Sequence, residues 1–193
     1  MKKSFFLWLF IAAMLFVQGQ GNTLYRVNIV KPKAGMKSAF EASWKMHLDK
    51  YHKTSDKRNV YEVTSGPELG SYVIVEGPFS YADMDKTLPN TKEHALDLEK
   101  NFTPKLEPGS QNFSARWADT LSYNGETKAE KFLLTITMVK DGKMAGYLTE
   151  IRRNALISAK LKSPFSYNIL IKQQAGSSPM IIGIRHLKDG YKE

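Results

Sequence analysis

The sequence contains no cysteine among its 193 residues. This absence excludes a disulfide scaffold, a thiolate-ligated metal or iron–sulfur site, a cysteine nucleophile and a lipoprotein anchor. Beyond residue 17 the chain also lacks any run apolar enough to span a bilayer. It has no dinucleotide fingerprint and no Gly-x-Ser-x-Gly elbow. These absences exclude several common enzyme classes, so other residues must indicate the function.

The N-terminus has the pattern of a secretory signal. Lys2 and Lys3 precede an unbroken apolar run over residues 5–17, and Gln and Gly follow it. The run is shorter than the roughly 20 residues of a membrane-spanning helix, so we expect cleavage after Gly19 and a periplasmic or secreted protein. An uncleaved N-terminal anchor is the alternative. After cleavage we expect no integral membrane segment.

Basic residues outnumber acidic ones, and the formal net charge is +9. A basic surface can attract nucleic acid or anionic polymers. Lysines at this density are typical of solvated helix faces, and the export signal argues against an intracellular target. We therefore expect no nucleic-acid partner. An envelope protein held by basic contacts to anionic surface polymers is a further interpretation, and it predicts binding that weakens with salt.

The residues after the signal predict the order β-α-β-β-α-β. Leu24–Val30 alternates apolar and polar residues, as a half-buried strand does. A helix is expected over residues 36–52, and a hairpin over residues 59–64 and 71–76. A second helix is expected between residues 80 and 105, with Ser80 as an N-cap, and a last strand over residues 111–123.

The same pattern then begins again. Residues 133–140 align with residues 24–31, and further strands are expected over residues 167–172 and 180–186. We interpret this as an internal duplication. The domains are then residues 1–19 (signal), 20–125 (first ferredoxin-like unit) and 126–193 (second unit, truncated before its second helix and fourth strand). A homodimer, a partner strand or a longer chain would cover the sheet edge left open.

The segments LYRVNIV (24–30), KPKAGMKSAFEASWKMH (31–47) and SYVIVEGPFSYADMD (71–85) resemble the dimeric α/β-barrel superfamily. Its members include proteins similar to antibiotic-biosynthesis monooxygenases and to the NIPSNAP family. The resemblance implies an α+β fold in which two ferredoxin-like units form a pseudo-dimeric barrel. It implies no single chemistry, because function depends on the site that a fold carries.

The first expected helix carries the candidate site. Its apolar stripe includes Phe40, Trp44 and Tyr51, and His47 falls within that stripe on a helical wheel. We expect these four residues to line a ligand pocket, in which His47 is the candidate catalytic group. The alternative is a core histidine whose ring nitrogens are satisfied. Asn154 stands at the corresponding place in the second unit.

A metal site and a cofactor are not expected. His47 and His52 are five residues apart, about 140° around a helix, which predicts different faces. His94 and His186 have no acidic or histidine partner at ligand spacing. Arg26, Asn28, Glu62 and Glu76 would face the barrel interior if the odd-numbered strand positions packed on the helices.

The sequence thus leaves two functions open. One is an exported barrel that binds a small, partly apolar ligand or serves as an assembly module. The other is a cofactor-independent monooxygenase or a haem-handling enzyme that uses His47. Whether the protein is an enzyme is not decided by the residues.

Overall fold

The computed structural model describes residues 23–52, 58–86, 91–123, 129–173 and 179–187, and it has an α+β fold. The expected signal at residues 1–19 lies outside them. Among the described helices, none combines the length and the apolar character needed to cross a membrane. The strands are β1 (Leu24–Val30), β2 (Arg58–Glu62), β3 (Tyr72–Phe79), β4 (Gln111–Trp117), β5 (Lys131–Met138), β6 (Tyr167–Lys172) and β7 (Met180–Leu187). The helices are α2 (Lys37–Tyr51), α3 (Tyr81–Met84), α4 (Thr91–Asn101) and α5 (Met144–Lys160), with 3₁₀ turns at Thr103–Lys105 and Asp119–Leu121.

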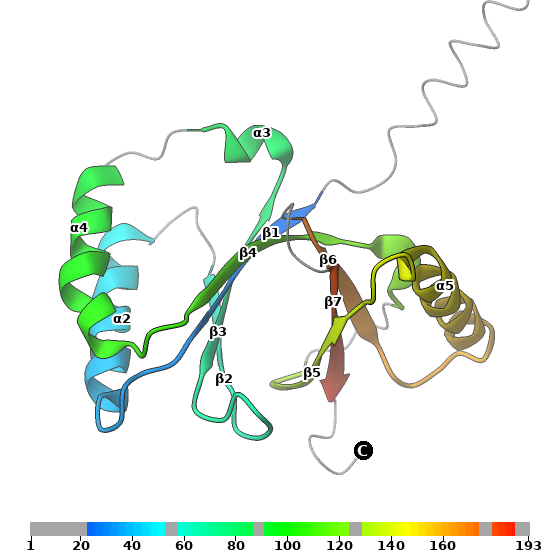
Figure 1. The fold of residues 1–193 in the computed structure, drawn as a ribbon, viewed down its shortest axis with the longest axis horizontal. Helices are drawn as coiled ribbons and strands as arrows, with labels where there is room; N and C mark the ends of the chain where they lie inside the picture. The colour runs from blue at the N-terminus through cyan, green and yellow to red at the C-terminus, as the bar shows by residue number, and fades with distance from the viewer. Residues whose placement is uncertain (1–22, 53–57, 87–90, 124–128, 174–178, 188–193) are drawn as a thin grey trace, which may run out of the picture.

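The strands form one seven-stranded antiparallel sheet in the order β2-β3-β1-β4-β6-β7-β5. The sheet is strongly curled, with α2 and α4 outside one half and α5 outside the other (Figure 1). β4 pairs with β6 and joins the two halves. The outer strands β2 and β5 approach each other through Tyr61 and Phe132, whose ring centroids are 5.1 Å apart. The curl therefore brings both ends of the sheet close together.

Three apolar clusters hold this arrangement. The first lies inside the curl, where Val27 and Phe113 of the first half meet Leu170 and Ile182 of the second. The second lies under α2 and α4 and includes Phe40, Trp44 and Phe102 with outward-facing residues of β1 and β3. The third lies under α5. Burial of apolar surface in these clusters, at roughly 25 cal/mol per Å², supplies the main driving force for this fold.

The polar strand positions face the helices and not the inside of the curl, because the odd-numbered positions of β1 do not pack on the helices. Val27 and Ile29 point inward, so Arg26 and Asn28 share the helix-facing side with Val30. The same alternation places Glu62 and Glu76 on that side. Arg26 and Arg58 both pair with Glu76, at 3.9 and 3.1 Å. The interior of the curl is instead apolar, which explains how both halves can pack there.

The 15-residue helix α2 determines the geometry of the candidate site. It buries Phe40, Ser43, Trp44 and His47 along one stripe, as the 3.6-residue period requires. His52 ends the helix as its C-cap, with φ −126° and ψ 26°, while its amide still donates to the Leu48 carbonyl at 2.9 Å. The backbone therefore leaves the helical path at His52, and the direction of that side chain no longer follows the helical wheel.

Candidate functional site

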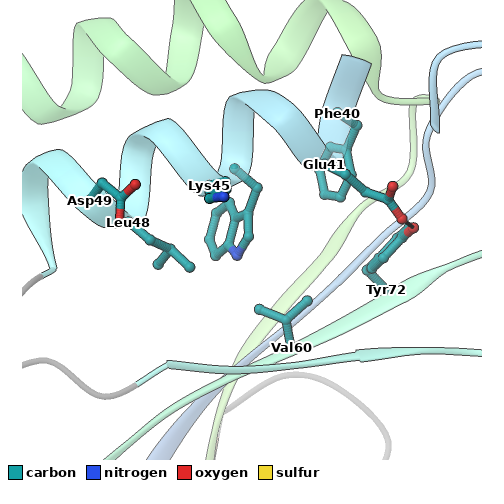
Figure 2. Close-up of a pocket in the computed structure, with 8 residues that line it drawn as sticks. Phe40, Glu41, Lys45, Leu48, Asp49, Val60 and Tyr72 are labelled. Carbon is teal, nitrogen blue, oxygen red and sulfur yellow. Dashed lines mark hydrogen bonds between the residues drawn. The ribbon is translucent and has the colours of Figure 1, made fainter. Parts of the chain in front are cut away.

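A cavity of about 210 Å³ lies between α2 and strand β2. Figure 2 shows Phe40 and Leu48 of α2 above Val60 of β2, with Glu41 turned towards Tyr72. Polar side chains stand among the apolar ones. The complete lining is Phe40, Glu41, Trp44, Lys45, Leu48, Asp49, Val60 and Tyr72. The cavity is thus amphipathic, with an apolar interior and charged groups on the helix side.

Trp44 is the most informative residue of this lining. Its side chain is buried, with 8 % of the residue exposed, and its ring packs edge-on against Phe102 at 5.0 Å. Within the part of the chain that the structure describes, the indole Nε1–H has no hydrogen-bond partner. A buried N–H donor without an acceptor costs about 1–3 kcal/mol. An acceptor supplied by a bound molecule would remove that cost.

Tyr72 and Glu41 form the polar end of the cavity. The Tyr72 hydroxyl donates to Glu41 Oε1 at 2.5 Å. Burial, together with this carboxylate, raises the pKa of Tyr72 well above its usual range. The hydroxyl therefore stays protonated at neutral pH, and Tyr72 is suited to hold Glu41 in place rather than to act as a base.

The second half has a cavity of about 300 Å³ between α5 and the sheet. Its lining includes Ile151 and Asn154, the positions that correspond to Trp44 and His47 in the first half, as well as Thr135 and Thr137. The two cavities are thus lined differently, because aromatic residues surround the first and hydroxyl and amide groups the second.

Of the four residues expected to line one pocket, two line this cavity, and the ring of His47 stacks behind that of Trp44 at 5.6 Å. Phe40 and Trp44 line the cavity beside β2, whereas His47 faces α4. The His47 side chain is 0 % exposed, and Nδ1 lies 2.6 Å from Asp97 Oδ2. The Tyr51 hydroxyl also reaches towards α4, where it donates to the Glu93 carbonyl at 3.4 Å.

His47, His52 and His94 form a cluster on the α4 side. The Nε2 atom of His52 lies 3.2 Å from that of His47 and 3.1 Å from that of His94. The expectation that His47 and His52 face different directions is therefore wrong, because His52 caps the helix instead of continuing it. His94 reaches the cluster from α4, which no spacing within α2 could indicate.

Burial and nearby charges set the protonation of this cluster. Burial lowers the pKa of His47, and the hydrogen bond that His47 donates to Asp97 offsets part of that effect. The same bond lowers the pKa of Asp97. Asn101 Nδ2 donates to the second oxygen of Asp97 at 2.8 Å and so orients the carboxylate. The ring of His47 is accordingly held in one orientation and is neutral at pH 7.

Sequence reasoning missed His52, His94 and Asp97 as members of the site. One signal was present: His94 and Asp97 are three residues apart, and this spacing places them on one face of α4. A second signal was that a histidine directly after a helix can turn back onto its last turn. Neither signal identifies the partner helix, since that depends on how α4 packs against α2.

Neither a comparison with protein-family models nor one with curated proteins finds a match for this sequence. Among solved structures, the chain is similar to a protein assigned as a monooxygenase, from Lactobacillus acidophilus NCFM. The TM-score is 0.56 at 8 % sequence identity, and the match covers 88 % of this chain and 79 % of that one. At this identity the likeness shows a shared α+β fold alone, and the activity of the neighbour is not transferred with it.

Proposed function

We propose that this protein is an exported α/β-barrel protein that binds a small, partly apolar molecule in the cavity beside α2. The observation that carries the proposal is the buried indole N–H of Trp44, which has no partner among the described residues and belongs to a residue of the cavity lining. Buried polar groups in native proteins almost always find a partner. A ligand that offers an acceptor oxygen to Trp44 would satisfy this group.

The size of the cavity restricts the ligand. Typical sites for drug-sized molecules measure about 300–1,000 Å³, and this cavity measures about 210 Å³. Phe40, Leu48 and Val60 favour an apolar body, and Trp44 favours a hydrogen-bond acceptor. The geometry therefore suits a single ring or short chain that carries one carbonyl or ether oxygen.

The topology supports a two-unit organisation, with a first unit over residues 20–125 and a second over 126–193. The first half has the order β2-β3-β1-β4 and the second β6-β7-β5, so corresponding strands occupy corresponding places. Within the described residues, the second half has no counterpart of α4 or β4. An assembly role, in which a partner strand or a second copy pairs with β5, is compatible with this arrangement.

The alternative function is a cofactor-independent monooxygenase or a haem-handling enzyme with His47 as the reactive group. The structural neighbour favours it, because that protein is assigned as a monooxygenase. The position of His47 favours the binding role instead. The side chain is enclosed, hydrogen-bonded to Asp97 and absent from the cavity lining, so a molecule in the cavity would not contact a free His47 nitrogen.

Indole NMR tests the binding proposal directly. The chain has three tryptophans, and Trp117 provides an internal control because its Nε1 already donates to Ser122 Oγ at 3.0 Å. Acetophenone is a suitable probe, since it combines one ring with one carbonyl. We expect its titration to shift the ¹⁵N–¹H signal of Trp44 and to leave that of Trp117 unchanged, with Trp44→Phe assigning the signal.

A cavity-filling variant completes this experiment. Val60→Phe places a ring in the space that the probe needs, so we expect the shift of the Trp44 signal to disappear while the fold is kept. A Trp44 signal that stays in place in the wild type up to the solubility limit of the probe would contradict the proposal. Equal shifts of both tryptophan signals would do so as well, because they would indicate non-specific binding.

A further inference from the structure

We propose that His47, His52 and His94 bind one divalent transition-metal ion, of the Zn²⁺ type, between α2 and α4. Each of the three histidines offers one ring nitrogen, and these atoms all lie within 4.8 Å of one another. The site is separate from the cavity beside β2, and the proposal does not depend on what that cavity binds.

The distances between the nitrogens match those of a metal site. Zn²⁺ binds imidazole nitrogens at about 2.0–2.1 Å in a tetrahedral arrangement, so two ligand nitrogens are about 3.3 Å apart. The His52–His47 and His52–His94 Nε2 separations are 3.2 and 3.1 Å. Two of the three nitrogen pairs thus already have the separation of tetrahedral zinc ligands, and the third pair lies within 4.8 Å.

A single proton on His52 Nε2 cannot form two well-directed hydrogen bonds in this cluster. A ring nitrogen of histidine either carries one hydrogen or offers one lone pair, and it uses that group in a single direction in the ring plane. His52 Nε2 nevertheless lies within hydrogen-bond distance of two other Nε2 atoms. At most one of the two contacts can be a well-directed hydrogen bond, because the single N–H or lone pair of His52 Nε2 points in one direction. A cation between the rings accepts all three lone pairs at once.

Asp97 fixes His47 in the tautomer that a metal ligand needs. His47 Nδ1–H donates to Asp97 Oδ2 at 2.6 Å, which leaves the lone pair on Nε2, the atom that faces His52. A carboxylate behind a metal-binding histidine is a common arrangement, since it fixes the tautomer and makes the ligand more basic. Asn101 holds the other oxygen of Asp97 at 2.8 Å. The site therefore has three histidine ligands, and Asp97 and Asn101 hold one of them, His47, in place.

The ligand chemistry selects the class of metal. Imidazole nitrogen suits Zn²⁺, Cu²⁺, Ni²⁺ and Fe²⁺, whereas Ca²⁺ and Mg²⁺ require oxygen ligands. Three protein ligands leave the fourth tetrahedral position for water or another small ligand, as in zinc sites that act on substrates. His52 and His94 are only partly buried, so an ion can reach the site from solvent.

The contribution of each histidine can be measured by calorimetric titration of Zn²⁺ into the purified, EDTA-treated chain. We expect one Zn²⁺ per chain. His47→Ala, His52→Ala and His94→Ala should each reduce the affinity by more than about 100-fold, a larger loss than second-layer substitutions produce. His186→Gln is the matched control, because His186 lies on β7 and contacts Asn168. It should bind Zn²⁺ as the wild type does.

A spectroscopic measurement keeps the test decisive if a histidine variant folds poorly. Co²⁺ in a four-coordinate site gives intense visible absorption bands, which Zn²⁺ then removes by displacement. We expect these bands in the wild type and in His186→Gln. Weak, non-stoichiometric Zn²⁺ binding by the folded wild-type chain would overturn the proposal. So would binding that survives in His52→Ala and is lost in His186→Gln.

Discussion

Replacement of Asp97 by Asn tests the link between fold and metal site most sharply. The variant keeps the shape of the side chain and an oxygen that can accept from His47 Nδ1, but it removes the negative charge. His47 is fully enclosed and the Asp97 side chain is 19 % exposed, so water screens this pair only in part. Asp97→Asn therefore changes one property of the site, the charge of a mostly buried hydrogen bond.

The size of the effect follows from hydrogen-bond energetics. A hydrogen bond to a charged group contributes about 1.5–3 kcal/mol and one between neutral groups about 0.5–1.5, so the loss is about 1 kcal/mol. For a chain of this length, that lowers the midpoint of thermal unfolding by about 2–4 °C without metal. The affinity for Zn²⁺ should fall by about 10–100-fold, as for other second-layer carboxylates.

Thermal unfolding with and without zinc measures both effects. At a Zn²⁺ concentration of 100 times the wild-type Kd, binding stabilises the wild type by about 2.7 kcal/mol, a rise of about 5–11 °C. At the same concentration, Asp97→Asn should gain only about 0.4–1.4 kcal/mol. Glu99→Gln is the matched control, since it removes one exposed acidic charge from the same helix. Equal zinc-induced rises in Asp97→Asn and Glu99→Gln would refute the reasoning.

Two further predictions concern pH and the backbone. Because the folded chain lowers the pKa of His47, the unfolded chain binds the proton more readily, so stability without metal should fall as the pH drops below about 6.5. The lowered pKa of Asp97 should add a second loss below about pH 4. Urea unfolding midpoints at several pH values check the first effect, and their fall between pH 7 and 5 should be smaller in His47→Gln than in the wild type. Gly77→Ala should destabilise the chain by more than about 1 kcal/mol in the same assay, because φ is +131° and a Cβ would lie 2.9 Å from the Leu24 carbonyl oxygen. A Gly77→Ala chain as stable as the wild type would contradict this reasoning.

The local sequence pattern predicted most of the helices and strands. Leu24–Val30 and residues 167–172 form strands over the expected ranges, because alternation and β-branched residues act locally. Ser80 caps α3 in a capping box with Asp83, as its position before acidic residues indicated. β4 is shorter than expected: it ends at Trp117, and a 3₁₀ turn follows at Asp119–Leu121. There, the apolar residue Leu121 packs under α5 rather than continuing the strand.

The candidate site could be predicted only in part. The helical period correctly placed His47 among the buried residues of α2. It could not show that His52 leaves the helix, that α4 lies beside this end of α2, or that Asp97 stands behind His47. These features depend on a cap conformation and on contacts between residues about 40–50 positions apart. The alternation in β1 also could not show which of its faces packs on the helices, because both faces of the strand are covered.

X-ray absorption spectroscopy at the zinc edge gives the most direct measurement of the metal site. The sample is the full chain loaded with one equivalent of Zn²⁺. We expect a first shell of four nitrogen or oxygen atoms at about 2.0–2.1 Å, with the outer-shell scattering of three imidazole rings. A shell dominated by five or six oxygen atoms, with one imidazole or none, would contradict it.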